Sequence, residues 1–210
     1  MPLATTEQNN IEENNLNPRK KSRLIRTVQA RFYPDLIVSS PEVIDYERLK
    51  SMGFQVILLD VDNTLVLHGS HEGDAFARAI VTKVEQAGLI PVIASNAREH
   101  RARSFADSLG VEFISQAKKP GIEAICQDLT KRSCAYHNAL MVGDQLLTDV
   151  WAARKAKIPV ILTEKRSPHE IITVKMKRVI ERLIRLLGGK DDWEMLKVID
   201  YDVLMRRPRS

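Results

Sequence analysis

The sequence contains little cysteine and no long apolar run. Its two cysteines, Cys126 and Cys134, are eight positions apart and have no histidine pair at metal-ligand spacing, which argues against a zinc site and against a disulfide framework. We therefore interpret both as reduced packing residues. The longest apolar run is far shorter than the roughly 18 residues that a membrane-spanning helix needs, so we expect no transmembrane segment.

Nucleotide-binding loops and nucleic-acid signatures are also missing. Gly188-Gly189-Lys190 lacks the upstream glycine and the following Ser or Thr of a Walker-type loop, and no Gly-x-Gly-x-x-Gly loop occurs. Aromatic residues make up 5% of the chain and offer few platforms for base stacking. We expect no nucleic-acid partner, and an RNA-binding module is kept only as an alternative of another class.

The N-terminal residues lack the apolar core of a secretory signal, so we expect a cytoplasmic protein. Its 32 Lys and Arg against 27 Asp and Glu give a net charge of +5, and the excess is unevenly spread. Six basic and no acidic residues lie between Pro18 and Pro34, and a second basic cluster spans residues 175–185. Both clusters could face an anionic surface, so a peripheral location at a membrane is an open alternative.

The pattern of the chain divides it into four segments. Residues 1–18 are polar and without periodicity, which predicts a disordered tail. Residues 19–45 are predicted to form a basic amphipathic segment and then an extended linker; the segment either lies on a membrane surface or docks on the domain. Residues 46–188 are predicted to form the main domain, and residues 189–210 a C-terminal tail without an assigned role.

Short apolar runs alternate with amphipathic segments throughout the predicted domain. The predicted strands cover residues 55–61, 89–94, 111–114, 139–142 and 158–162. The predicted helices cover residues 46–52, about 74–87, a segment ending at Gly110, 121–131, a segment from about Thr148, and 169–187. This alternation implies right-handed β-α-β crossovers, and hence an α/β fold whose mostly parallel sheet has helices on both faces.

Polar side chains stand at the ends of four predicted strands. They are Asp60 with Asp62, Ser95 with Asn96, Lys119, and Asp144 with Asp149. Because the carboxyl ends of parallel strands meet at one edge of a sheet, we expect these side chains to converge. Crowded carboxylates repel one another unless a hard cation lies among them, and their oxygens suit Mg²⁺. A lysine and a hydroxyl beside that cation would suit a phosphoryl group.

These residues resemble the four ordered motifs of the haloacid dehalogenase (HAD) superfamily of phosphohydrolases. The motifs are Asp60-Val61-Asp62-Asn63-Thr64, Ser95-Asn96, Lys119-Pro120 and the block from Gly143 to Asp149. Residues 59–66, 117–120 and 173–182 are closer to subclass IIIA and its YqeG-type branch, and the resemblance covers about residues 32 to 187. That branch is similar to the organellar phosphatidylglycerophosphate phosphatases. The resemblance implies a Rossmann-like HAD fold.

The resemblance also implies catalytic roles for the first two aspartates. Asp60 would attack the phosphorus and become a phospho-aspartate, which is covalent catalysis by a carboxylate. Asp62 would protonate the leaving alkoxide and then deprotonate the water that hydrolyses the intermediate. Its position two residues after Asp60 argues against a non-enzymatic phospho-receiver, because a built-in acid-base group promotes turnover.

The remaining motif residues are implied to bind phosphate and metal. The implied phosphate-binding residues are Thr64, Ser95, Asn96 and Lys119. The implied ligands of Mg²⁺ are Asp60, Asp144, Asp149 and the backbone carbonyl of Asp62. Each motif taken alone could equally be an ordinary turn or helix cap, but their common order at four strand ends favours the site.

Other polar residues near these motifs have ordinary explanations. His68 and His71 lie in the predicted flap, residues 67–73, where exposed histidines are usually unliganded. Arg98 and Arg101 follow Ser95 and could reach substrate oxygens, but the spacing favours solvated positions on a helix.

The spacing of the motifs restricts the substrate. Only 30 residues separate Thr64 from Ser95, and 23 separate Asn96 from Pro120, so neither gap can hold a cap domain. We expect an open, capless site, which fits a phospholipid head group, and phosphatidylglycerophosphate is the substrate that the resemblance favours. Helix 169–187 has an apolar stripe beside cations; this stripe could touch a membrane, but packing on the sheet is favoured. A cytosolic phosphatase of a soluble phosphate ester or phosphoprotein is the alternative.

Overall fold

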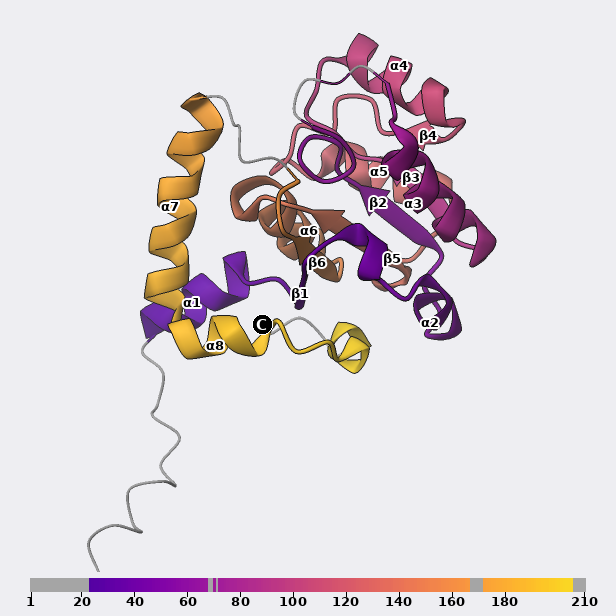
Figure 1. Ribbon diagram of the computed structural model, residues 1–210. Coiled ribbons are helices and arrows are strands. Elements are labelled where there is room, and N and C mark those ends of the chain that lie inside the picture. Colours follow the sequence, from indigo (N-terminus) through magenta and orange to yellow (C-terminus); the bar gives the residue numbers. More distant parts are fainter. Residues whose placement is uncertain (1–22, 68–69, 71, 167–171, 206–210) are drawn as a thin grey trace, which may run out of the picture.

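The computed structural model describes residues 23–67, 70, 72–166 and 172–205, with residues 172–178 described by their backbone. The predicted disordered tail, residues 1–18, lies outside these ranges, as do His68 and His71. The described residues form a central sheet with helices on both sides (Figure 1).

All neighbouring strands of this sheet are parallel. The strands are β1 (Leu36–Val38), β2 (Val56–Leu59), β3 (Ile90–Ile93), β4 (Glu112–Phe113), β5 (Ala139–Gly143) and β6 (Val160–Thr163), in the order β1-β6-β5-β2-β3-β4. The predicted α/β fold with a parallel sheet is thus confirmed. In the centre, Leu59 is in register with Ile93 on one side and Val142 on the other, so the chain leaves β2, β3 and β5 at the same edge.

Two apolar layers hold the helices to the sheet. One layer joins the sheet to α1 (Arg23–Phe32), α5 (Glu123–Lys131), α6 (Trp151–Ala156) and parts of α7 (Ile172–Gly188) and α8 (Lys190–Met195). The other joins it to α2 (Tyr46–Ser51), α3 (Ala75–Gln86) and α4 (Glu99–Leu109). Within β2, Val56 and Leu58 belong to the first layer and Ile57 and Leu59 to the second, because successive side chains of a strand point to opposite faces.

Short polar residues and one glycine set the ends of the helices near the site. The side chains of Asp45 and Asp74 accept hydrogen bonds from backbone amides in the first turns of α2 and α3 and so cap them. Helix α4 ends at Gly110, whose φ of 72° lies in the left-handed region that glycine adopts without strain.

An edge strand replaces part of the predicted linker. Residues 36–38 form β1, which pairs in parallel with β6 and is buried on both sides. Three apolar residues are too few to show a strand period, and their partner lies far along the chain. The local sequence therefore could not reveal this pairing.

The segment after residue 188 packs against the same edge of the sheet. Trp193, Tyr201 and Leu204 are buried, the last two in the short helix η5 (Tyr201–Met205). The amide of Ile37 in β1 donates a hydrogen bond of 2.8 Å to the carbonyl of Leu196. The sequence predicts a tail without a role here, whereas the described part of this segment covers β1.

Helix α1 lies against α6 and α7. The ring of Phe32 contacts that of Trp151, with 5.3 Å between their centroids. The buried side chain of Gln29 donates a hydrogen bond to the carbonyl of Gly188, and the hydroxyl of Tyr33 donates to the carbonyl of Gly189. Of the two interpretations of the basic segment, docking on the domain therefore describes residues 23–33.

The apolar stripe of α7 faces solvent in its described part. Ile184 is buried, but five neighbours have exposed fractions between 48% and 71%: Val179, Ile180, Leu183, Leu186 and Leu187. The prediction that this stripe packs on the sheet is wrong for the four of these residues that it included, which are Val179, Ile180, Leu183 and Leu187. Among the helices of the described ranges, none has the length and apolarity needed to cross a bilayer.

Candidate active site

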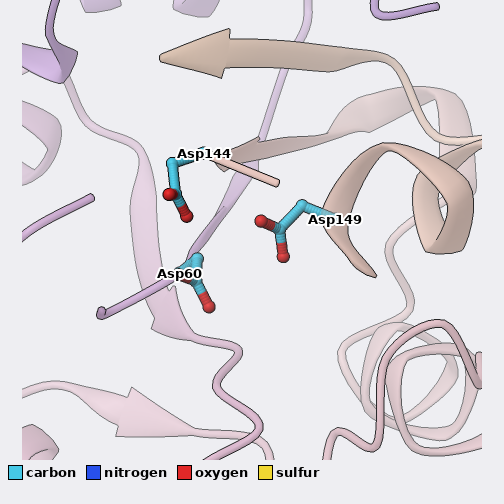
Figure 2. A group of neighbouring side chains, drawn as sticks. All are labelled: Asp60, Asp144 and Asp149. Atoms are coloured by element: carbon cyan, nitrogen blue, oxygen red, sulfur yellow. The ribbon is translucent and has the colours of Figure 1, made fainter. Parts of the chain in front are cut away.

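Three carboxylates converge at the carboxyl edge of the sheet. Asp60 follows β2, Asp144 follows β5, and Asp149 lies in the short π-helix η4 (Leu146–Val150). Figure 2 shows the three side chains as neighbours. Carboxylate oxygens of the three residues lie within 4.8 Å of one another, and all three residues are buried.

Lys119 lies between two of these carboxylates. Its Nζ atom is 2.7 Å from Oδ1 of Asp60 and 2.5 Å from Oδ1 of Asp149, and its side chain is 1% exposed. The sequence predicts that strand ends bring Lys119 to the aspartates, and the structure brings these three residues together.

Burial and the neighbouring charges shift the pKa values of Asp60 and Lys119. Burial raises the pKa of Asp60 to about 7, and Asp149 adds to the rise while the ammonium of Lys119 opposes it. Burial lowers the pKa of Lys119, but Asp149 and Asp60 outweigh it and raise this pKa above the ordinary lysine value. Lys119 therefore stays protonated at neutral pH and holds a positive charge beside Asp60.

Asn96 joins the second motif to the third. Its Nδ2 donates a 2.7 Å hydrogen bond to the carbonyl of Lys119, and its Oδ1 accepts one of 2.7 Å from the amide of Lys119. This reciprocal pair fixes the backbone from which the lysine side chain extends into the site. The sequence predicts a phosphate contact for the Asn96 amide, and it gives no signal for this second task of the side chain.

Ser95 and Thr64 place hydroxyl groups close to the carboxylates in sequence and at the same sheet edge. Ser95 is 2% exposed, and its Oγ accepts a hydrogen bond of 3.1 Å from the amide of Ala97, which leaves the hydroxyl proton available to a ligand. Thr64 is fully buried, and its Oγ1 has no hydrogen-bond partner among the described residues. Buried polar groups are normally paired, so a ligand oxygen would satisfy this hydroxyl.

A tight turn follows Asp62. The amide of Asn63 donates to the carbonyl of Val66 at 2.8 Å, and Asn63 has a φ of 63°, a left-handed conformation that asparagine tolerates better than most residues. This turn places the Asp62 side chain outside the group of three carboxylates. It is 16% exposed and forms a two-fold hydrogen-bonded ion pair with Arg101.

Arg101 is thus held inside the site and is not solvated as the sequence favours. Its Nη1 and Nη2 donate to the two carboxylate oxygens of Asp62 at 2.9 and 2.6 Å, and its Nε donates to the carbonyl of Ser70 at 2.9 Å. Helical spacing could not reveal this contact, because it depends on where Asp62 and Ser70 lie relative to α4. Arg98 is exposed, as the sequence predicts.

Close packing positions Asp149. The amide of Gln145 donates a 3.0 Å hydrogen bond to its Oδ2, and a Cβ atom on Gly143 would lie 2.5 Å from its carboxyl carbon. The amide of Leu146, at the start of η4, donates to Oε1 of Glu181 in α7 at 2.8 Å, and Glu181 is 1% exposed. Helix α7 therefore supports the loop that carries Asp149.

The donor set fits a hard divalent cation. The three buried carboxylates supply oxygen atoms and negative charge at one point, and the ammonium of Lys119 contacts two of them. Oxygen ligands of this kind suit Mg²⁺ or Ca²⁺ rather than softer metals. Asp60, Asp144 and Asp149 are the residues that could hold such an ion.

A carboxylate at a strand end, a buried lysine, free hydroxyls and an acidic cluster are the groups that phosphoryl transfer requires. They would neutralise the charge of a phosphoryl group and hold it in line with an attacking oxygen. Together with the parallel sheet, they define an α/β phosphohydrolase.

Comparisons with known proteins agree with this class. A family model described as HAD-hydrolase-like matches residues 116–184, a range that includes Lys119, Asp144 and Asp149. The "Probable phosphatase YqeG" of Bacillus subtilis is 29% identical over 153 residues, which are 73% of this chain and 89% of that protein. The chain is therefore similar to phosphatases of the HAD superfamily.

Solved structures of low similarity were also found. The core domain of a candidate phosphoglycolate phosphatase from Streptococcus pneumoniae has a TM-score of 0.41 and 23% identity, covering 61% of this chain and 96% of that one. The N-terminal part of a Bacteroides fragilis protein, containing a phosphatase domain complexed with Mg, has a TM-score of 0.39 and 17% identity, covering 57% and 38% of the two chains.

Proposed function

We propose that this phosphatase hydrolyses phosphate monoesters through a phospho-aspartate on Asp60, and that its substrate is phosphatidylglycerophosphate. The observation that carries the mechanism is the contact of 2.7 Å between Asp60 and the buried ammonium of Lys119 at the carboxyl edge of the sheet. This contact supports a mechanism in which the nucleophile Asp60 and the incoming phosphate share the ammonium of Lys119 as their counter-ion.

In the first step an oxygen of Asp60 attacks the phosphorus, and the bond from phosphorus to the leaving alkoxide breaks. Asp62 gives its proton to that alkoxide. In the second step Asp62 takes a proton from water, the resulting oxygen attacks the phospho-aspartate, and inorganic phosphate leaves with Asp60 restored. Lys119 and the hydroxyls of Ser95 and Thr64 hold the phosphoryl oxygens, and the amide of Asn96 assists.

Mg²⁺ is the cofactor that we infer. Asp60, Asp144 and Asp149 would hold it with their carboxylates, and Asp62 with its backbone carbonyl. When bound, the cation neutralises charge on the phosphoryl oxygens and on the crowded carboxylates.

The lipid substrate is supported by α7 and by the short gaps between motifs. At about 100° per residue, the five exposed apolar side chains of α7 lie within about a third of the helix circumference. Exposed arginines accompany them: Arg182 on α7 itself, and Arg23 and Arg26 on the adjacent α1. An apolar strip beside cations suits an anionic membrane, which the enzyme would approach from the cytoplasm.

The mechanism is tested with Asp60→Asn. We expect no turnover of any phosphate ester, because an amide is a poor nucleophile, while circular dichroism and thermal unfolding show a folded protein. Asp107→Asn, at an exposed position of α4, is the matched control and should keep full activity. We also expect phosphoenzyme trapping by acid quenching to label the wild type and to leave the Asp60→Asn variant unlabelled. Full activity of Asp60→Asn would overturn the mechanism.

The substrate is tested by comparing phosphatidylglycerophosphate in mixed micelles with a panel of soluble phosphomonoesters. We expect the lipid to have the highest kcat/KM. Leu183→Glu should reduce turnover on anionic vesicles and leave soluble esters unaffected, whereas Val43→Glu, at another exposed apolar residue, should change neither. Turnover confined to soluble esters would remove the lipid substrate and leave the phosphatase mechanism standing.

A further inference from the structure

The ion pair between Arg101 and Asp62 competes with the step that Asp62 is proposed to perform. Both carboxylate oxygens accept hydrogen bonds from the guanidinium, at 2.9 and 2.6 Å. The guanidinium therefore competes with a leaving group for the lone pairs of Asp62. Movement of Arg101 away from one oxygen would leave that oxygen to the leaving group.

A second anionic group can cause that movement by competing with Asp62 for the guanidinium. A guanidinium presents its donors in a planar fork that binds carboxylate and phosphate groups in the same two-fold manner. The Arg101 side chain is 18% exposed, so solvent reaches it, and it contacts the proposed proton donor directly. A charged group on the leaving part of a substrate would reach this position as the phosphate reaches Asp60.

We infer that Arg101 is a specificity residue, which exchanges Asp62 for a second anionic group on the substrate. The enzyme would then select phosphate monoesters that carry a phosphate or carboxylate a few bonds beyond the ester oxygen. Binding of that anion releases Asp62 at the moment when a substrate is in place. This inference rests on the proposed function, and the phosphodiester of a phosphorylated phosphoglycerol head group would be such an anion.

The local electrostatics agree with this exchange. Hydrogen bonding to Asp62 raises the pKa of Arg101, and the charge of Asp60 contributes to the rise. Because an arginine side chain is protonated at neutral pH with or without such a partner, the guanidinium stays charged when it leaves Asp62. The third contact, from Nε to the carbonyl of Ser70, can hold the side chain in place while the two Nη groups change partner.

A merely structural role for Arg101 makes a different prediction. If the arginine only fixes Asp62 and the flap, its loss should affect all phosphate esters alike. If it binds a second anion, its loss should affect only esters that possess one. Glycerol 3-phosphate and 3-phosphoglycerate separate these outcomes, because they share a carbon skeleton and differ by a carboxylate.

The experiment measures kcat and KM for both esters in the wild type, Arg101→Met and Arg101→Lys. We expect the wild type to prefer 3-phosphoglycerate by about 10- to 100-fold in kcat/KM, the range of a hydrogen-bonded charged group. Arg101→Met should abolish the preference, mainly through KM, and Arg101→Lys should restore part of it. Arg103→Met, at an exposed arginine of the same helix, should retain the wild-type preference.

A binding measurement separates this inference from the proposed function. Calorimetry on Asp60→Asn, with and without Arg101→Met, should show tighter binding of 3-phosphoglycerate only when Arg101 is present. Absence of turnover with every ester would refute the proposed function, while the binding preference would still decide the role of Arg101. An equal loss on both esters, or equal binding of both, would overturn the inference.

Discussion

Lys119 and Asp149 form an ion pair deep inside the protein. Nζ of the lysine lies 2.5 Å from Oδ1 of the aspartate, and each side chain is 1% exposed. The same ammonium contacts Asp60, so one positive charge serves two carboxylates. Removing it would leave both negative charges buried without their cation, which proteins tolerate poorly.

Replacing Lys119 by methionine should therefore reduce both stability and activity. In a chelator we expect the free energy of unfolding to fall by about 3–5 kcal/mol, the usual cost of removing one partner of a buried pair. Added Mg²⁺ should restore more stability to this variant than to the wild type, since the cation relieves the same repulsion. Urea unfolding with chelator and with Mg²⁺ measures both effects.

The neighbouring lysine provides the control. Lys118→Met removes an equal charge from an exposed position and should change the stability little. If Lys119→Met and Lys118→Met behaved alike, the buried ammonium would have no special part in holding the carboxylates together.

Asp144 is expected to bind the metal without contributing to the lysine pair. Asp144→Asn should keep the fold in chelator but lose the stabilisation by Mg²⁺, which for the wild type is about 2.7 kcal/mol at a hundred times the dissociation constant. Thermal unfolding over a range of Mg²⁺ concentrations measures this loss. A variant that Mg²⁺ stabilised as strongly as the wild type would exclude Asp144 as a ligand.

The convergence of the site could be predicted from the sequence because it follows from topology. Asp60 and Asp144 each come directly after a buried strand, and parallel strands end at one edge of a sheet. The contact of Arg101 with Asp62 could not be predicted, because α4 carries more than one arginine and only the folded positions of Asp62 and Ser70 distinguish Arg101.

Strand β1, at the edge of the sheet, could not be predicted for a different reason. Strand β1 has only three residues, and its stability depends on pairing with β6 and on cover from the segment around Leu196. Such contacts join distant parts of the chain and leave no periodic pattern in it. The central strands are longer, continuous apolar runs, and their existence was predictable although their ends differ by one or two residues.

Gly143 is expected to be required for the position of Asp149. A Cβ atom at residue 143 would lie 2.5 Å from the Asp149 carboxyl carbon, so Gly143→Ala must displace that side chain. We expect weaker stabilisation by Mg²⁺ and lower kcat, measured on the same preparations. Gly110→Ala is the comparison: its Cβ would have no neighbour within 4 Å, and its cost of about 1 kcal/mol arises from the left-handed backbone, so its response to Mg²⁺ should match that of the wild type.

The segment after α7 should contribute to stability through Trp193. This side chain is 5% exposed and packs edge-to-face on Tyr33, with 5.2 Å between the ring centroids. Trp193→Ala should lower the free energy of unfolding by about 3–5 kcal/mol, the usual cost of deleting a large buried aromatic side chain. Met195→Ala, at a residue of α8 that is 70% exposed, should cost far less. Urea unfolding of the two variants measures the difference. Equal stability of the two variants would mean that α8 does not hold α1 and α7 together, because loss of its buried ring would then not lower the free energy of unfolding any further.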